Sequence, residues 1–326
     1  MATPNKDLIL KELETMRQGD LIRGEKFSAI AYAKAMKGIK ALPGDITSVD
    51  DVKNIAGIGA KIQAKVKEIL ETGSLKAAER TKKELNLDIY DALLKVHGIG
   101  PVAARKLVKE HGITSIADLR AKQHLLNEVQ KMGLKYYEDI LERIPRAEML
   151  LHEKILQSCL PKDTTGIIVG SFRRQAVNSG DIDMLITFQS DVPESKQKAA
   201  FLAYVNSLKS CGYIRDVLAS GAKKCMAVVS LGSDNKCRRL DLLITPHEEF
   251  AYSILYFTGS DLFNVAFRAY ALKQGYTLNE HEMKPTGDKS PPPTMKSEKD
   301  IFDFLGLKYI DPKERKGESE IIKLTP

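Results

Sequence analysis

The chain has 326 residues, more than a single small domain uses, so we expect a large hydrophobic core divided over two or more packed units. It is 29% charged and 43% hydrophobic, and its formal net charge of +7 is spread along the chain without a basic tail. No apolar run approaches the ~18 residues that a membrane span needs, and the polar first residues lack the apolar stretch of a secretion signal. We therefore expect an intracellular protein with no membrane partner.

The four cysteines lie far apart in the sequence, at positions 159, 211, 225 and 237. They form no Cys-x-x-Cys pair and have no histidine at ligand spacing, so the sequence predicts neither a zinc site nor a disulfide framework. This cysteine usage is typical of a reducing compartment.

The spacing of apolar residues changes near Pro145. Before it, apolar residues recur at intervals of three and four, which predicts helices at Lys6–Met16, Glu25–Lys40, Ala60–Thr72 and Pro101–His111. After it, short branched runs bounded by turn residues predict strands at Thr165–Val169, Ile182–Phe188, Met226–Leu231 and Leu240–Ile244. The segment Lys284–Thr294, with three consecutive prolines, is predicted to be an exposed loop. We therefore predict a multidomain α+β protein, all helical at the start and mixed later, with boundaries near positions 88, 145 and 246.

A glycine motif occurs twice, 41 residues apart: Gly57 and Gly59 flank an isoleucine in the first copy, and Gly98 and Gly100 in the second. Two glycines one residue apart allow a tight turn between helices, and the free N–H groups of the next helix suit a phosphate. A single copy would more simply be an ordinary turn, but two copies favour a functional motif. The pattern resembles tandem helix-hairpin-helix motifs, which bind the DNA backbone without reading sequence, commonly with Na⁺ or K⁺ on the hairpin carbonyls.

The stretch from Gly170 to Ile186 combines a Gly-Ser turn, two arginines and two acids. Asp181 and Asp183 lead into a predicted strand two residues apart, so their carboxylates leave the same face, and Asp241 lies in a second apolar strand that we expect to pair alongside. Carboxylates this close repel one another unless a cation neutralises them, and an all-oxygen site suits Mg²⁺. Three carboxylates can hold two metal ions, as phosphoryl transfer requires. A simple turn cap, the alternative, would need neither a second acid nor the arginines.

The Gly170-Ser171 turn, the Asp181-x-Asp183 pair and the later strand carboxylate together resemble the nucleotidyltransferase superfamily. Within it, Gly-Ser-Phe-Arg-Arg combined with Tyr-Phe-Thr-Gly-Ser at 256–260 resembles the family X DNA polymerases, and the resemblance extends over most of the chain. It implies a helical 5′-deoxyribose-phosphate lyase domain (1–88), a helix-hairpin-helix duplex-binding subdomain (89–145), a nucleotidyltransferase-type α/β catalytic palm (146–246) and a small C-terminal α+β nucleotide-selection subdomain (247–326).

The resemblance also implies roles for the palm residues. Asp181, Asp183 and Asp241 would bind two Mg²⁺ ions, with Mn²⁺ as a substitute, and Asp241 would help to deprotonate the primer 3′-hydroxyl. Arg239 would contact DNA. Four residues would bind the incoming deoxynucleoside triphosphate: Arg146, Ser171, Arg174 and Gly180. Gln175 departs from the family pattern, which usually has glycine after the paired arginines.

The segment from Tyr256 to Arg268 carries the other candidate nucleotide contacts. An aromatic pair and a glycine are predicted to form a turn, after which Ser260 or Asp261 can cap a helix. On that helix the phenylalanines share a face that we expect to be core, and the polar residues share another, which suits the minor-groove acceptors of every correct base pair. The resemblance implies that Arg268 contacts the templating side, and that five residues bind the nucleotide: Tyr256, Phe257, Gly259, Asp261 and Asn264.

The helix after the first glycine pair carries a cluster of lysines that includes Lys61 and Lys65. Crowded like charges cost helix stability, and such a cluster suits a 5′-phosphate beside an amine nucleophile that forms a Schiff base with an abasic sugar. Spacing alone does not choose between Lys65 and Lys106, its equivalent in the second copy. The resemblance chooses Lys65 and offers Lys26 and Lys61 as phosphate ligands. The alternative is that these lysines make plain contacts with the DNA backbone.

We therefore expect a template-directed, gap-filling DNA polymerase with 5′-deoxyribose-phosphate lyase activity in base excision repair. Its partners would be gapped or nicked duplex DNA and deoxynucleoside triphosphates, and it would be a monomer, nuclear in a eukaryote. The alternative is a template-independent terminal transferase. The resemblance disfavours it, because transferases of this family carry a long loop between two palm strands, whereas the link Ser230–Cys237 is short. A non-catalytic DNA-bridging protein would not need the three acids. No exonuclease domain follows the family core in the sequence, so we expect no proofreading.

Overall fold

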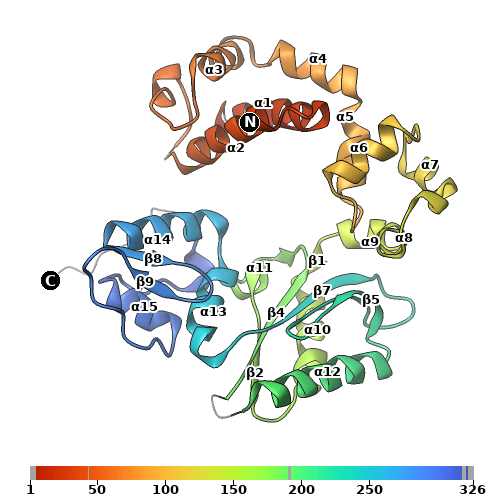
Figure 1. Ribbon diagram of the computed structural model, residues 1–326, viewed down its shortest axis with the longest axis vertical. Helices are drawn as coiled ribbons and strands as arrows, with labels where there is room; N and C mark the ends of the chain where they lie inside the picture. Colours follow the sequence, from red (N-terminus) through yellow and green to blue (C-terminus); the bar gives the residue numbers. More distant parts are fainter. Residues whose placement is uncertain (1–4, 43, 190–191, 318–320, 322–326) are drawn as a thin grey trace. The chain divides into compact units, whose positions relative to one another are not determined.

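The computed structural model describes residues 5–42, 44–189, 192–317 and 321, which are drawn in colour in Figure 1. The chain divides into two compact units, Met1–Lys135 and Tyr136–Pro326. An all-helical first part followed by a mixed α and β part confirms the predicted fold class. The finer division into four parts stays a prediction. No helix in the described parts of the chain is both long and apolar enough to cross a bilayer.

The described part of the first unit consists of helices and their connections. Its α-helices are α1 (Asn5–Arg23), α2 (Lys26–Ala41), α3 (Ala60–Thr72), α4 (Lys76–Leu85), α5 (Leu87–Leu94), α6 (Pro101–Lys109), α7 (Ile116–Ala121) and α8 (Glu128–Lys135). Ile9 and Leu13 of α1 pack with Ile39 of α2 and Val66 of α3 in one core. The first helix continues past the predicted end at Met16 and ends before Gly24, which has a φ of +88°.

The two glycine motifs adopt the same backbone geometry. Gly57 and Gly98 have φ values of +94° and +84°, which favour glycine, while Gly59 and Gly100 are the extended N-cap residues of α3 and α6. A Cβ atom at Gly57 would lie 3.0 Å from the Cβ of Lys34, so the turn also packs closely. The repeat inferred from the sequence is therefore a structural repeat.

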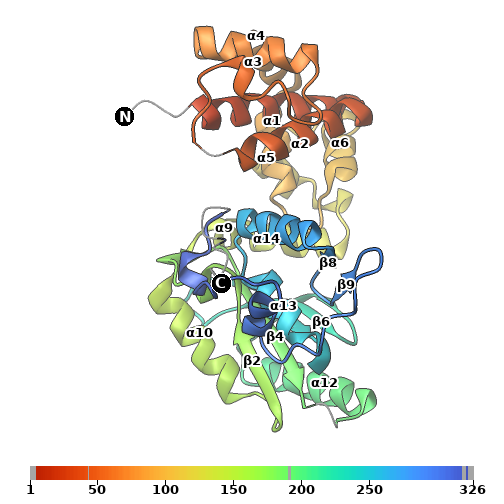
Figure 2. The same cartoon turned by 90° about the vertical axis from the view of Figure 1, so that its left-hand side faces the viewer.

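The second unit contains a five-stranded sheet in the order β2-β4-β7-β6-β5, of which β2, β4 and β6 are labelled in Figure 2. Its strands are β2 (Thr164–Ile168), β4 (Ile182–Phe188), β5 (Ile214–Ser220), β6 (Lys224–Val229) and β7 (Arg238–Ile244). Only the β4–β7 pair is parallel. The sequence predicted four of these strands but missed β5, whose pairing with β6 contains register shifts. A short antiparallel pair, β1 (Ile144–Pro145) and β3 (Asn178–Ser179), lies outside the sheet.

Helices α10 (Arg146–Ser158) and α12 (Glu194–Ser210) pack against one face of this sheet. The core there takes alternate residues of β4 and β7, such as Met184 and Leu242, together with Leu156 and Phe201 from the two helices. Leu185, on the opposite face of β4, packs instead with Ile254 of α13 (Phe250–Thr258). The odd-numbered positions of β4 therefore face away from α10 and α12.

A third core lies in the C-terminal part of the second unit. It joins α13 to α14 (Asp261–Lys273), α15 (Glu298–Phe304) and the hairpin β8 (Tyr276–Leu278) and β9 (Met283–Pro285). The phenylalanine face predicted for α14 is part of it, because Phe263 and Phe267 are fully buried. The predicted loop Lys284–Thr294 begins later than expected, since Lys284 and Pro285 pair in β9.

Candidate active site

The three acids meet near the start of β4, because β4 and β7 are adjacent parallel strands. We call this place, formed by Asp181, Asp183 and Asp241, the acid edge. The register pairs Asp183 directly with Asp241, which confirms the predicted pairing of their strands, and Asp181 precedes β4 by one residue. Since the neighbours Met184 and Leu242 enter the core under α10 and α12, Asp183 and Asp241 extend from the opposite face. The local sequence therefore places the carboxylates of Asp183 and Asp241 side by side on the face of the sheet that α10 and α12 do not cover.

Two basic side chains, Arg239 and Lys224, lie among these carboxylates. Arg239 Nη2 is 2.5 Å from Asp181 Oδ2, and Lys224 Nζ is 3.4 Å from Asp241 Oδ2. Burial, with the nearby charges of Asp181 and Asp241, raises the pKa of Asp183 to about 7. The buried Oδ1 atom of Asp241 accepts no hydrogen bond. Negative charge at this edge is therefore incompletely compensated by the chain itself.

This donor set fits a hard divalent cation. Carboxylate oxygens are the ligands that Mg²⁺ takes, and Asp241 Oδ1, which accepts no hydrogen bond and lies 3.5 Å from Arg239 Nε, can accept a cation. In the described residues, no group of three His, Cys, Asp or Glu side chains is already arranged around a common metal position.

The Gly-Ser turn lies beside the acids. Gly170 has a φ of +62° and begins the single-turn helix α11 (Gly170–Arg173), and Val169 N donates to Asp183 O across 2.9 Å. The hydroxyl of Ser171 donates to Ser179 Oγ across 3.0 Å. Gln175, which departs from the family pattern, has a φ of +60°, the left-handed conformation that glycine adopts most easily.

The predicted turn at 256–259 is instead the end of a helix. Tyr256 and Phe257 belong to the last turn of α13, and Gly259 follows with a φ of +68°. Arg174 Nη1 donates to the carbonyl of Thr258 across 2.5 Å, and a Cβ atom at Gly259 would lie 3.1 Å from it. The predicted cap is confirmed for Ser260, whose side chain accepts from Phe263 N. Gly259 is therefore required both by its positive φ and by the close approach of the Arg174 side chain.

A cleft of about 400 Å³ brings most of the predicted palm and selection residues together. Two of its lining residues, Arg143 and Gly170, are not among the predicted contacts. The predicted residues that line it are Ser171, Arg174, Gly180, Asp181, Asp183, Tyr256, Phe257, Gly259, Asp261 and Asn264. A mixed anionic and cationic lining suits a ligand that has both phosphate groups and bound metal.

Arg143 and Arg146 differ in what they contact. Arg143 donates to Asn178 through Nε, at 2.8 Å from Oδ1, and through Nη2, at 3.0 Å from the carbonyl. A Cβ atom at Gly180 would lie 3.1 Å from Arg143 Nη1. Arg146, the predicted ligand, donates to the carbonyl of Phe172 and lies 4.7 Å over its ring. The role of Arg146 stays a prediction, and Arg143 is a candidate that sequence reasoning missed although it lies three residues away.

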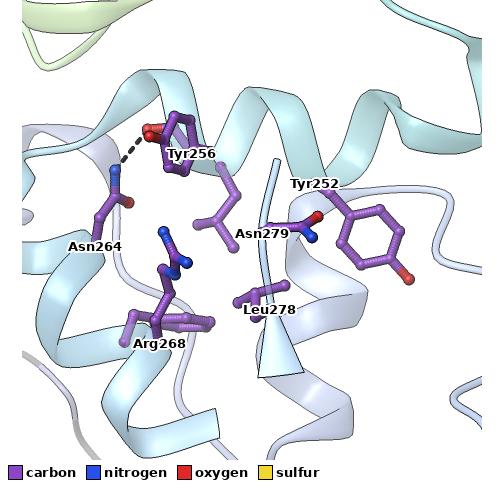
Figure 3. A pocket seen from close by; sticks show the side chains of 8 residues that line it. Tyr252, Tyr256, Asn264, Arg268, Leu278 and Asn279 are labelled. Atoms are coloured by element: carbon purple, nitrogen blue, oxygen red, sulfur yellow. Dashed lines mark hydrogen bonds between the residues drawn. The ribbon is translucent and has the colours of Figure 1, made fainter. Parts of the chain in front are cut away.

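The polar face of α14 opens onto a small hollow beside β8, shown in Figure 3. Asn264 Nδ2 donates to the carbonyl of Tyr256 across 2.7 Å, which is the dashed line in the figure. The side chain of Arg268 extends into the same hollow, with Asn279 on its far side. Asn264 thus lines both the cleft and this hollow.

The candidate lyase residues lie in the first unit. Lys61 is exposed and Lys65 half-buried on α3, and Lys26 is exposed as the first residue of α2. Phe27, next to Lys26, has 91% of its side chain exposed. Sequence reasoning did not single out Phe27, although an exposed aromatic ring beside a lysine is typical of a nucleic-acid surface.

Models of known protein families match the chain in four consecutive segments. They are a helix-hairpin-helix domain (4–75), the fingers domain of DNA polymerase lambda (91–141), the DNA polymerase beta palm (143–247) and the DNA polymerase beta thumb (253–316). These matches support the resemblance inferred from the sequence.

Two curated relatives align with nearly all of the chain. DNA polymerase lambda of Rattus norvegicus is 32% identical and covers 94% of it, and DNA polymerase lambda of Arabidopsis thaliana is 30% identical and covers 90%. The chain spans 56% and 58% of the length of these relatives. The family segments follow one another in order and these two polymerases align across them, so the chain is similar to family X DNA polymerases over most of its length.

Proposed function

We propose that this protein is a template-directed, gap-filling DNA polymerase that also removes 5′-deoxyribose phosphate. The observation that carries the proposal is the cleft in which the paired acids, the Gly170-Ser171 turn and the Tyr256–Asn264 region meet. Such a cleft suits a deoxynucleoside triphosphate together with a primer end. The tandem glycine motifs of the first unit support binding of duplex DNA through its backbone.

In the polymerase reaction, the primer 3′-oxygen attacks the α-phosphorus of the triphosphate and pyrophosphate leaves. Asp181, Asp183 and Asp241 would hold two Mg²⁺ ions, or Mn²⁺ in their place, which supply Lewis-acid activation and charge neutralisation when bound. Asp241 would receive the proton of the 3′-hydroxyl. Ser171 and Arg174 would bind the triphosphate and offset its charge in the transition state.

Nucleotide selection would depend on the end of α13 and on α14. Tyr256 and Phe257 would lie against the sugar and disfavour a ribose 2′-hydroxyl, while Asn264 and Arg268 would contact minor-groove acceptors on either side of the new pair. Asn264 donates to Tyr256 O in this structure, so it would exchange this bond for one to the base. These contacts test the shape of a pair and not its sequence.

In the lyase reaction, Lys65 would act as the nucleophile. Its amine would attack the C1′ aldehyde of the abasic sugar and lose water to form a Schiff base. In the β-elimination that follows, C2′ would lose a proton while the C3′–O bond breaks and the DNA 5′-phosphate leaves, and water would then hydrolyse the imine and release Lys65. Lys26 and Lys61 would bind that phosphate, and Gly57, Gly59, Gly98 and Gly100 would contact the backbone through their turns, with Na⁺ or K⁺ at the hairpins.

A single substrate tests the polymerase activity: a duplex with a one-nucleotide gap, supplied with Mg²⁺ and the four deoxynucleoside triphosphates. We expect the wild-type protein to fill the gap and the Asp181→Ala/Asp183→Ala variant to lose this activity by a factor on the order of 10³ or more. Gap filling by the double variant at the wild-type rate would contradict the proposal. Equal extension of a single-stranded primer would instead support a terminal transferase.

The lyase activity is tested with a 5′-deoxyribose phosphate at the gap and borohydride, which traps an imine as a stable covalent adduct. We expect the wild-type adduct to form and the Lys65→Ala variant to lose it, while Lys106→Ala keeps it. Undiminished trapping by Lys65→Ala would transfer the nucleophile to another amine. If DNA binds but neither reaction occurs, the protein only bridges DNA.

A further inference from the structure

We propose that residues 290–296, the proline ridge, are a docking site for a protein domain whose groove is lined by aromatic rings and has an acidic pocket at one end. The ridge lies between β9 and α15 and contains three consecutive prolines. None of its residues belongs to the proposed polymerase or lyase site. The inference therefore does not depend on the proposed function.

The backbone of the proline ridge is constrained by its own sequence. Each proline at 291–293 fixes its φ at about −65°. Each residue that precedes a proline, from Ser290 to Pro292, is driven toward an extended ψ. The two constraints together specify polyproline II, a left-handed helix with about three residues per turn. In agreement, residues 289–295 form neither an α-helix nor a strand.

Burial along the ridge has the same period of three. Pro292 is half-buried, Met295 is 3% exposed in the core of the C-terminal part, and Glu298 at the start of α15 is 6% exposed. The residues between and before them are exposed: Ser290, Pro291, Pro293, Thr294, Lys296 and Ser297. One edge of the helix therefore faces the protein, and the other two edges face solvent.

Both ends of the ridge are held by hydrogen bonds. At its start, Tyr276 Oη of β8 donates to the carbonyl of Ser290 across 3.2 Å. At its end, Lys296 N donates to Asp300 Oδ2 across 2.8 Å, and Asp300 also closes the capping box of α15. The ridge is thus held in an extended form before a partner binds, which reduces the conformational entropy lost on binding.

The carbonyl groups of the ridge suit a partner that offers hydrogen-bond donors. Proline has no N–H group, and among the described residues the backbone of positions 291–294 takes part in no hydrogen bond. Tyrosine and tryptophan side chains in an aromatic groove can donate to such carbonyls while their rings pack on proline rings.

The two exposed edges define the chemistry of the partner. One edge carries Ser290, Pro293 and Lys296, and the other carries Pro291 and Thr294. A groove that binds a helix with about three residues per turn contacts two edges and leaves the third free. Two aromatic-lined pockets would take residues 290–291 and 293–294, and an acidic pocket beside them would pair with Lys296. The edge that such a groove leaves free is the one packed on the core.

The inference is tested with a set of purified SH3 domains whose aromatic grooves end in an acidic pocket, titrated into the full chain by calorimetry. We expect at least one domain to bind saturably. Pro291→Ala/Pro293→Ala should weaken this binding by about tenfold or more, because the pockets lose the proline rings. Pro193→Ala is the matched control, since Pro193 is an exposed proline outside the ridge, and its affinity should equal that of the wild type.

The charge of Lys296 is tested separately. Lys296→Met should weaken binding several-fold and reduce its dependence on salt, because one ion pair with the acidic pocket is lost. Lys299→Met, which removes an exposed lysine three positions further on, should have no effect. Binding by none of the domains would overturn the inference, as would equal affinity of the wild type and Pro291→Ala/Pro293→Ala.

Loss of binding must be separated from loss of folding. Pro291→Ala/Pro293→Ala keeps Pro292 and Met295 on the core, so its melting temperature and its gap filling should stay close to those of the wild type. If its melting temperature falls, Lys296→Met decides, because that side chain is exposed. A wild-type protein that binds a domain but fills no gap would contradict only the proposed function.

Discussion

Asp183 is a residue at which proton and metal binding should compete. Its pKa is raised to about 7 by burial and by Asp181 and Asp241, so between about pH 4 and pH 7 the folded protein binds a proton that the unfolded chain does not. The free energy of unfolding should therefore fall as the pH rises through this window without metal. His152 acts in the opposite direction, because burial lowers its pKa.

We expect Mg²⁺ to stabilise the protein more at about pH 8 than at about pH 5, since a cation replaces the lost proton. Thermal melting at both values, with and without Mg²⁺, measures this effect. The comparison with Asp183→Asn removes the contribution of His152, which both proteins share. An equal pH dependence in Asp183→Asn and the wild type would show that Asp183 does not carry the effect.

Gln175 has a left-handed backbone, a conformation that glycine adopts most easily. The left-handed conformation costs a residue with a Cβ about 1–2 kcal/mol. Glycine avoids this cost, but it loses more conformational entropy on folding, which lowers the free energy of unfolding by about 0.5–1 kcal/mol. Gln175→Gly should therefore stabilise the protein by about 0.5–1 kcal/mol, measured by urea unfolding, with little change in KM. Ala176→Gly, at a neighbouring site without positive φ, should destabilise it. A loss of stability in Gln175→Gly would mean that its side chain makes a compensating contact.

Helix α15 is joined to α11 by a buried carboxylate. Burial raises the pKa of Glu298, but hydrogen bonds and charge from Arg173 and Arg315 outweigh it and hold the pKa at about 2. Arg173 Nη2 is 2.7 Å from Glu298 Oε1, and Arg315, 1% exposed, donates to both oxygens across 3.0 Å. This carboxylate thus ties α15 to the helix that begins at the Gly170-Ser171 turn.

We expect Glu298→Gln to lower the free energy of unfolding by about 3 kcal/mol, because two arginines lose their buried counter-charge. Lys299→Met, at the next residue, removes an exposed pair with Asp303 and should change stability by less than about 0.5 kcal/mol. Urea unfolding near neutral pH measures both. Equal effects of the two substitutions would contradict the importance assigned to the buried carboxylate.

Elements with strong patterns were predictable, and those that depend on distant partners were not. The bounds of α3 and β4 agree with the sequence prediction, since apolar spacing and flanking turn residues mark both ends. The end of α1 was missed because Asp20 interrupts the apolar pattern, yet it is buried and accepts a hydrogen bond from Ser28. In the site, the acids stand out by spacing, whereas the position of Arg143 follows from Asn178, 35 positions away in the sequence.

At the scale of the whole molecule, each unit has a core of its own. The core of the first unit takes buried residues from Ile9 to Ala78, and the second unit contains the cores of the sheet and of the C-terminal part. We expect each piece to fold when expressed alone, with a cooperative thermal transition. Residues 1–135 should keep imine trapping, and residues 136–326 should keep triphosphate binding but lose affinity for gapped DNA. An unfolded 1–135 fragment would contradict this independence.

The parallel register of β4 and β7 makes the site sensitive to chain length in a way that substitutions do not reveal. Side chains alternate between the faces of a strand, so the deletion of Leu240 would turn Asp241 toward the core and bring Leu242 to the acid edge. Loops such as Ser230–Cys237 have no such alternation to preserve. We therefore expect natural length variation among relatives to fall in the loops, while the two strands change only by replacement.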